Sequence, residues 1–206
     1  MPVKAVYATS AWLLQHREAV GRLPADAVKE VDNAVLKQLS ALTTPNNAMA
    51  LLDMPAADTG LPPEGAVVLA LEAIQDPGNM GTLIRIADWF GIRQLIVSPD
   101  CVDVYNPKTI QATMGSIARV QVKEMDILQL LEESTLPSYA ATLHGEDITR
   151  FTTLREGIIL IGNEGRGLSD EVIAHATHRI TIPRLGGAES LNAAVAAGVI
   201  CGRLLI

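Results

Sequence analysis

Short apolar runs alternate with segments of helical periodicity along most of the chain. The apolar runs are rich in Val, Ile and Leu, and apolar residues recur at helical spacing between them. Short strands that are apolar on both faces are typical of a parallel sheet covered by helices. The alternation therefore predicts an α/β fold with a parallel sheet and helices on both sides. The expected strands are 67–71, 94–98, 119–122, 139–142, 158–161 and 179–182, and the expected helices are 80–90, 107–114, 126–133, 169–175 and 191–205.

A smaller unit precedes this sheet. Residues 59–65 read Thr-Gly-Leu-Pro-Pro-Glu-Gly, and two prolines and two glycines so close together interrupt regular structure. We therefore expect a small α/β domain at 1–58, a linker at 59–65 and a larger domain at 66–206. A domain of this size buries little surface, so we expect it to be incomplete or to lean on the larger one. Its expected strands are 4–8, 27–32 and 48–53, and its expected helices are 10–16 and 33–40.

Composition and charge exclude several classes of protein. The 206 residues include 16 basic and 23 acidic side chains, which gives a net charge of −7. No apolar run approaches the roughly 18–20 residues of a membrane span, and the first residues show no signal-peptide pattern, so we expect a cytoplasmic protein without a membrane anchor. Two cysteines, Cys101 and Cys201, are too few for a disulfide framework or a zinc site, and we expect no metal.

The same numbers bear on nucleic-acid binding. Aromatic residues make up only 3% of the chain, which disfavours a platform on which bases stack. The acidic balance disfavours binding along a phosphate backbone regardless of sequence. Local basic patches on an acidic chain remain compatible with RNA binding.

Three segments with glycine and asparagine each follow a predicted strand. The first segment (75–81) reads QDPGNMG, the second segment (162–169) reads GNEGRGLS, and the third segment (182–192) reads IPRLGGAESLN. Ligands of open α/β sheets gather at the carboxyl ends of the strands. None of the three matches a phosphate-loop or dinucleotide consensus. The residues alone predict a small-molecule pocket at the strand ends, of a kind that suits a nucleotide-like cofactor.

The two helices that follow the first and third segments raise open questions. Arg85 lies off the apolar stripe of its helix, so it can point toward the end of the sheet, pair with Asp88 or rest on Trp89. Ser190 is a plausible N-cap of the last helix. That helix, at 193–206, is apolar on nearly every side, so we expect it to be buried all round, in the core or in a subunit interface.

In order and content the three segments resemble the SpoU family of RNA ribose 2′-O-methyltransferases, within the SPOUT superfamily. The resemblance covers about 66–206 and implies an α/β sheet with a C-terminal trefoil knot, S-adenosylmethionine as cofactor, and a homodimer whose interface includes the last helix. Residues 1–58 resemble the later part of the RNA substrate-binding domain that many members carry in front. The matching residues are Asn79, Gly81 and Arg85 in the first motif, Gly162 to Gly165 in the second, and Ile182, Pro183, Ser190, Leu191 and Asn192 in the third.

The resemblance also implies roles for individual residues. Arginine is always protonated, so we expect Arg85 to stabilise the developing alkoxide and to fix a phosphate, while a substrate phosphate or water accepts the proton. The implied cofactor-binding residues are Leu143, Gly145, Gly162, Ile182 and Leu191; the implied catalytic residues are Asn79, Arg85, Glu164, Ser190 and Asn192; Arg166 and Arg184 are candidates for RNA contacts.

The resemblance thus implies methylation of a ribose in ribosomal or transfer RNA. One alternative is a non-catalytic RNA-binding or assembly factor that keeps the knotted fold. Another is an unrelated nucleotide-binding α/β enzyme, which would bind a phosphorylated cofactor instead. The polar residues of the three motifs are all present, and this favours the enzyme.

Overall fold

The computed structural model describes residues 1–40, 42–56 and 60–206, and the chain forms two compact units, Met1–Ala57 and Asp58–Ile206. Of the predicted linker, Thr59 lies outside the described residues. Residues 60–63 have no regular structure, and 64–65 form a turn. Residues 60–65 are held within the second unit, because Lys123 Nζ donates to the carbonyl of Gly60 at 3.0 Å and the Gly65 amide donates to Glu156 at 2.9 Å.

The first unit is a three-stranded sheet with short helices. Its strand order is β2-β1-β3, in which β1 pairs parallel with β2 and antiparallel with β3. The helices begin at polar caps: Thr9 Oγ1 accepts from the amide of Trp12, and Asp32 Oδ1 accepts from the amide of Val35. The helix predicted at 10–16 ends at Gln15, and a second short helix that was not predicted begins at Arg17. The elements are β1 (Val3–Ala8), α1 (Ser10–Gln15), α2 (Arg17–Val20), the 3-10 turn η1 (Ala25–Ala27), β2 (Val28–Glu30), α3 (Asn33–Leu39) and β3 (Ala48–Leu52).

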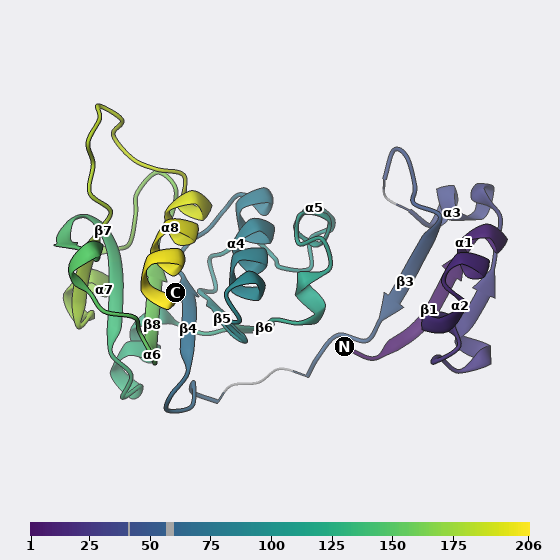
Figure 1. Ribbon diagram of the computed structural model, residues 1–206, viewed down its shortest axis with the longest axis horizontal. Coiled ribbons are helices and arrows are strands. Elements are labelled where there is room, and N and C mark those ends of the chain that lie inside the picture. The colour runs from purple at the N-terminus through teal and green to yellow at the C-terminus, as the bar shows by residue number, and fades with distance from the viewer. Residues whose placement is uncertain (41, 57–59) are drawn as a thin grey trace. The chain divides into compact units, whose positions relative to one another are not determined.

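The second unit is built on six strands in the order β6-β5-β4-β8-β7-β9 (Figure 1), and every pairing in this sheet is parallel. The predicted parallel α/β fold is thereby confirmed. Its strands are β4 (Val67–Leu71), β5 (Gln94–Val97), β6 (Gln121–Glu124), β7 (Ser138–Asp147), β8 (Gly157–Ile161) and β9 (His178–Thr181); its helices are α4 (Pro77–Trp89), α5 (Pro107–Ala112), α6 (Ile127–Glu133), α7 (Asp170–His175) and α8 (Ala193–Leu205), with 3-10 turns η2 (Ser116–Ala118) and η3 (Ile148–Arg150).

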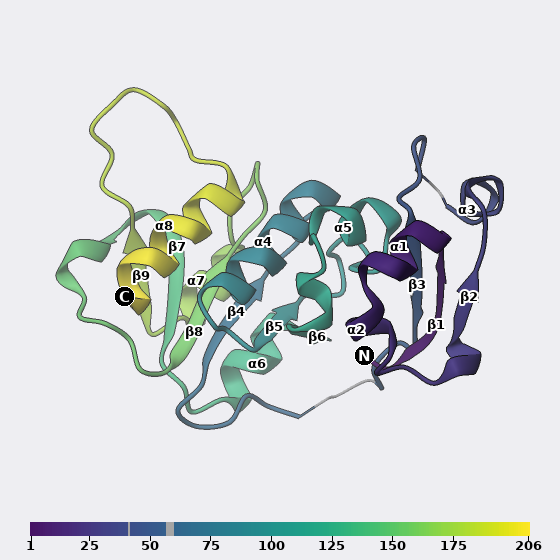
Figure 2. The same cartoon turned by 45° about the vertical axis from the view of Figure 1, so that its right-hand side comes forward.

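Helices cover both faces of this sheet, which explains its continuous apolar strands. Val68 and Ile158 pack with α6 and α7 in one apolar cluster. Leu69 and Leu71 are fully buried as well and point to the opposite face, since side chains alternate along a strand. On that face α4 and α8 lie side by side (Figures 1 and 2).

Two expectations about the second unit differ from the structure. The strand expected at 119–122 is β6 at Gln121–Glu124, because Arg119 ends the turn η2 and bonds to Asp88. The last helix is not buried all round within one chain: Val195 is 53% exposed and Val199 is 42% exposed. One face of α8 is therefore free to be covered by another molecule.

Candidate active site

The three motif segments meet at one edge of the sheet. They follow β4, β8 and β9, and these strands belong to a parallel sheet, so their carboxyl ends lie at the same edge. The third segment forms the long loop between β9 and α8, drawn in yellow-green in Figure 2. Ligand sites of open α/β sheets lie at this edge.

The first segment forms the start of α4. Asp76 caps the helix, since its Oδ1 accepts from the Asn79 amide at 2.7 Å, and Pro77 occupies the first turn. This places Asn79 in the first turn, next to the strand ends. Gly81 follows, and a Cβ there would lie 2.4 Å from the Cβ of Ala112, so the close packing of α5 requires glycine.

A chain of side-chain hydrogen bonds links all three segments. Asn192 caps α8, because its Oδ1 accepts from the amides of Ala194 and Val195. Its Nδ2 is then left to donate, and it donates to Asn79 Oδ1 at 3.0 Å. Asn79 Nδ2 in turn donates to Glu164 Oε1 at 2.8 Å. The structure therefore brings together three of the predicted catalytic residues. The N-cap of α8 is Asn192 and not Ser190, so that prediction for Ser190 is wrong.

The second segment is closed too tightly for a side chain at its first residue. A Cβ on Gly162 would lie 2.2 Å from the carbonyl carbon of Gly167. Asn163 and Gly167 pair their backbones in both directions, at 3.0 and 2.9 Å. Only glycine can hold position 162, and the turn brings Glu164 to Asn79.

The residues predicted to hold the cofactor come from three neighbouring strand ends. Between Ala141 and Glu146, which both pair with Ile180, residues 142–145 bulge out of β7. The bulge is fastened to β9, because Thr181 Oγ1 donates to the Leu143 carbonyl at 3.3 Å.

The side chains at this edge suit an adenine. Leu143 is 66% exposed, and Leu185 and Leu191 are exposed as well. Uncovered leucine side chains can contact the face of a flat ring, and the neighbouring loop backbone can hydrogen-bond the polar edge of that ring. The residues present therefore fit S-adenosylmethionine. Leu185 could not be singled out from the sequence, because a lone leucine in a glycine-containing loop carries no signal.

Arg85 stands apart from this network. By helix geometry it lies about 9 Å along α4 from Asn79 and is rotated from it by about 120°. It is exposed, and among the described residues it has no hydrogen bond, ion pair or ring contact. The suggested pairing with Asp88 is wrong: Asp88 accepts from Arg119, with a shortest distance of 2.6 Å. That guanidinium, helped by Ser116, lowers the pKa of the Asp88 carboxyl.

The remaining predicted residues are exposed on the loops. Arg166 and Ser190 face solvent. Arg184 is exposed too, and its Nη1 donates to the Ala188 carbonyl of its own loop at 3.2 Å. None of the three joins the Glu164–Asn79–Asn192 network as the described residues stand.

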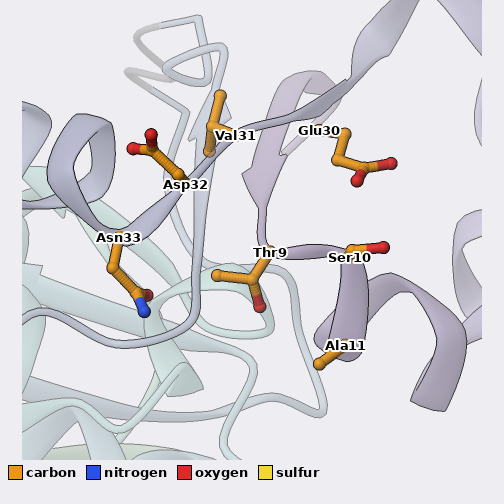
Figure 3. A pocket seen from close by; sticks show the side chains of 7 residues that line it. All are labelled: Thr9, Ser10, Ala11, Glu30, Val31, Asp32 and Asn33. Carbon is orange, nitrogen blue, oxygen red and sulfur yellow. The ribbon is translucent and has the colours of Figure 1, made fainter.

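The first unit holds an open cavity of about 460 Å³ at the carboxyl ends of β1 and β2 (Figure 3). The sequence analysis did not anticipate it. Its two carboxylates disfavour a phosphate group. It is lined by Thr9, Ser10, Ala11, Glu30, Val31, Asp32 and Asn33, none of which is a residue predicted for the cofactor.

The described residues contain no group of three or more His, Cys, Asp or Glu side chains placed to hold a metal ion. No helix among them is long and apolar enough to cross a membrane.

Comparison with known proteins shows the family of this chain. The model of the SpoU rRNA Methylase family matches residues 66–202. A 23S rRNA (guanosine(2553)-2′-O)-methyltransferase of Bacillus subtilis is 30% identical over 197 residues, covering 87% of this chain and 75% of its own.

Solved structures agree as well. A putative RNA methyltransferase of the TrmH family from Porphyromonas gingivalis is 38% identical with a TM-score of 0.85, over 98% of this chain and 82% of its own. An AdoMet-bound rRNA methyltransferase from Sinorhizobium meliloti is 26% identical with a TM-score of 0.82, over 98% and 79%. The resemblance stated from the three motifs is confirmed, and the chain belongs to the SpoU rRNA methylase family.

Proposed function

We propose that this chain transfers the methyl group of S-adenosylmethionine to a ribose 2′-hydroxyl of ribosomal or transfer RNA. The observation that carries the proposal is the hydrogen-bonded chain Glu164–Asn79–Asn192, which joins all three motif segments at the ligand edge of the sheet. The 2′-O specificity of the Bacillus subtilis relative and the AdoMet bound by the Sinorhizobium meliloti neighbour support it.

The cofactor-binding residues are those at the ends of β7, β8 and β9. When bound, S-adenosylmethionine supplies an electrophilic methyl group on a sulfonium, so the protein has mainly to orient and activate the hydroxyl. Exposed leucines would cover the adenine, and the backbone of the turns would hydrogen-bond its edge. The holding residues are Leu143, Gly145, Gly162, Ile182 and Leu191.

The catalytic residues act on the ribose. Asn79 and Asn192 are fixed by their mutual bond, and each keeps polar atoms with which to position a sugar hydroxyl. Ser190 completes the set from the third segment. Arg85 stabilises the oxygen as it loses its proton and binds the adjacent phosphate, and a substrate phosphate or water accepts that proton.

The active species is a homodimer. Arg85 does not reach Asn79 of its own helix, so the arginine at each site comes from the second chain. The exposed apolar residues Trp89, Val195 and Val199 lie on α4 and α8, the two helices that pack side by side. Covering this face with a second copy buries the apolar side chains and brings Arg85 of one chain to the network of the other.

RNA is recognised outside this network. Arg166 and Arg184 contact phosphates from the loops of the site. Residues 1–58 act as part of an RNA substrate-binding domain, and the chain works in the cytoplasm on rRNA or tRNA. The C-terminal part of the sheet, as in the SPOUT superfamily, is threaded as a trefoil knot.

The test is transfer of tritium from labelled S-adenosylmethionine into RNA, followed by mapping of ribose positions that resist alkaline hydrolysis. Asn79→Ala and Arg85→Ala should each lower transfer by about 10²–10³-fold. The matched control is Arg93→Ala, an exposed arginine just before the amino end of β5, at the opposite edge of the sheet, and it should leave transfer unchanged. Base methylation instead of ribose methylation, or full activity in Arg85→Ala, would overturn the proposal.

A further inference from the structure

Asn163, the residue before Glu164, makes three hydrogen bonds with its side chain. Its Oδ1 accepts from the amide of Gly165 at 2.9 Å and from the amide of Arg166 at 3.1 Å. Its Nδ2 donates to the carbonyl of Ala73 at 2.8 Å. One amide therefore closes the turn of the second segment and fastens this turn to the end of β4.

Ala73 is an unusual partner. Its φ of +55° lies in the left-handed region, which costs conformational energy for every residue except glycine, and it is only 5% exposed. Side chains from two other strand ends hold it: its amide donates to Ser98 Oγ at 2.9 Å, and its carbonyl accepts from Asn163. The conformation of Ala73 thus depends on neighbours that reach it from β5 and β8.

Ala73 and Asn163 each lie a few residues before one partner of the Asn79–Glu164 hydrogen bond. Three residues after Ala73, Asp76 caps α4 and binds the Asn79 amide. One residue after Asn163, Glu164 accepts from Asn79 Nδ2 at 2.8 Å. The Asn163–Ala73 bond therefore sets how far the turn of Glu164 stands from the start of α4.

We propose that Asn163 is a positioning residue for the methyl-donor site: by binding the carbonyl of Ala73 it holds the second segment against the first and keeps Glu164 in register with Asn79. The proposal rests on the function proposed above. In this role Asn163 does not touch the substrate, and it acts only through the two segments that it joins.

The far end of the second segment offers a matched control. Ser169 donates from its amide and its Oγ to the carboxylate of Glu72, at 2.8 and 2.7 Å, and it also caps α7. Ser169→Ala removes the Oγ bond of a bridge between the same two strand ends, keeps the amide bond, and leaves the turn that holds Glu164 untouched. It should lower the thermal midpoint and leave cofactor affinity within about twofold of the parent chain.

The test uses the full chain and S-adenosylhomocysteine as the probe in calorimetry. Asn163→Ser keeps a short acceptor for the turn but does not reach Ala73, and Asn163→Asp keeps the acceptor but replaces the donor by a carboxylate oxygen that repels the Ala73 carbonyl. Each should weaken binding by roughly tenfold while circular dichroism stays native.

Amide hydrogen exchange over residues 72–80 supplies a readout that is independent of the cofactor. Exchange should quicken in Asn163→Ser and Asn163→Asp and stay unchanged in Ser169→Ala. Parental affinity and parental exchange in both Asn163 variants would overturn the positioning role. Failure of the parent chain to bind the probe would overturn the proposed function instead, and the exchange rates would still decide whether Asn163 couples the two segments.

Discussion

Arg85 and Glu164 are expected to serve the same reaction from different chains, and this can be tested with two inactive variants. Arg85 lies about 9 Å along α4 from Asn79 and about 120° around it, while Asn79 binds Glu164 at 2.8 Å. Arg85→Ala should lower transfer by about 10²–10³-fold, which is the usual cost of one group that stabilises developing charge, and Glu164→Ala should lower it to a similar extent because Asn79 loses the acceptor that orients it. In a homodimer of either variant, both active sites lack one of the two residues.

A hybrid dimer distinguishes a shared site from a self-contained one. If the residues come from different chains, a dimer of one Arg85→Ala chain and one Glu164→Ala chain contains one site with both residues intact and one with neither. The hybrid should therefore show about half of the parental activity per dimer. If both residues acted within one chain, each site of the hybrid would lack one of them, and activity would stay near that of the pure variants.

The assay is tritium transfer from labelled S-adenosylmethionine to RNA by hybrids co-expressed with two different tags and purified through both. The matched control is a hybrid of Asn79→Ala with Glu164→Ala, which removes two residues of the same hydrogen-bonded network and should stay inactive. Background activity in the Arg85/Glu164 hybrid, or full activity in a chain that ultracentrifugation shows to be monomeric, would refute the reasoning.

Three further predictions concern single positions. Gly162→Ala should abolish binding of S-adenosylhomocysteine in calorimetry, because its Cβ would lie 2.2 Å from Gly167 and displace the turn, and it should cost about 1–3 kcal/mol in urea unfolding. Hydrogen bonding to Arg119 lowers the pKa of the Asp88 carboxyl below its ordinary 3.8, so the ionised pair stabilises the fold fully above pH 3.8. This stabilisation is lost as the pH falls through the lowered pKa. The difference in unfolding free energy between the parent and Asp88→Asn should therefore narrow in acid. Burial raises the pKa of the Cys201 thiol to about 12, so a thiol reagent at pH 8 should label it only after unfolding, as mass spectrometry would show.

The parallel sheet is the part of the structure that the pattern of residues predicts best. Strands buried on both faces leave runs such as 158–161 with no polar residue, and such runs are visible without any knowledge of tertiary contacts. The position of β6 is less visible: Arg119 adjoins an apolar run but ends the turn η2, since Asp88 of α4 holds its guanidinium. That contact joins residues 31 positions apart, and no local periodicity encodes it.

Some residues of the candidate site could be predicted from the sequence and others could not. Asn79, Glu164 and Asn192 follow from the resemblance, and in the structure Glu164 and Asn192 are each hydrogen-bonded to Asn79. Their catalytic roles stay predictions. Ala73 and Asn163 could not be found from the sequence, because alanine disfavours the left-handed conformation and its carbonyl leaves no trace in the pattern of side chains.

Charge is divided unevenly between the two units, and this limits how RNA can be bound. Residues 1–57 carry five basic and five acidic side chains, whereas residues 58–206 carry eleven basic and eighteen acidic ones. The unit that holds the site therefore repels a phosphate backbone at long range, and the first unit is neutral and adds no general attraction. Affinity has to come from particular contacts at short range, for which the exposed Arg166 and Arg184 stand on the loops of the ligand edge. Such an enzyme selects RNA whose shape fits its surface, because the phosphate charge of an RNA alone adds little to the binding affinity.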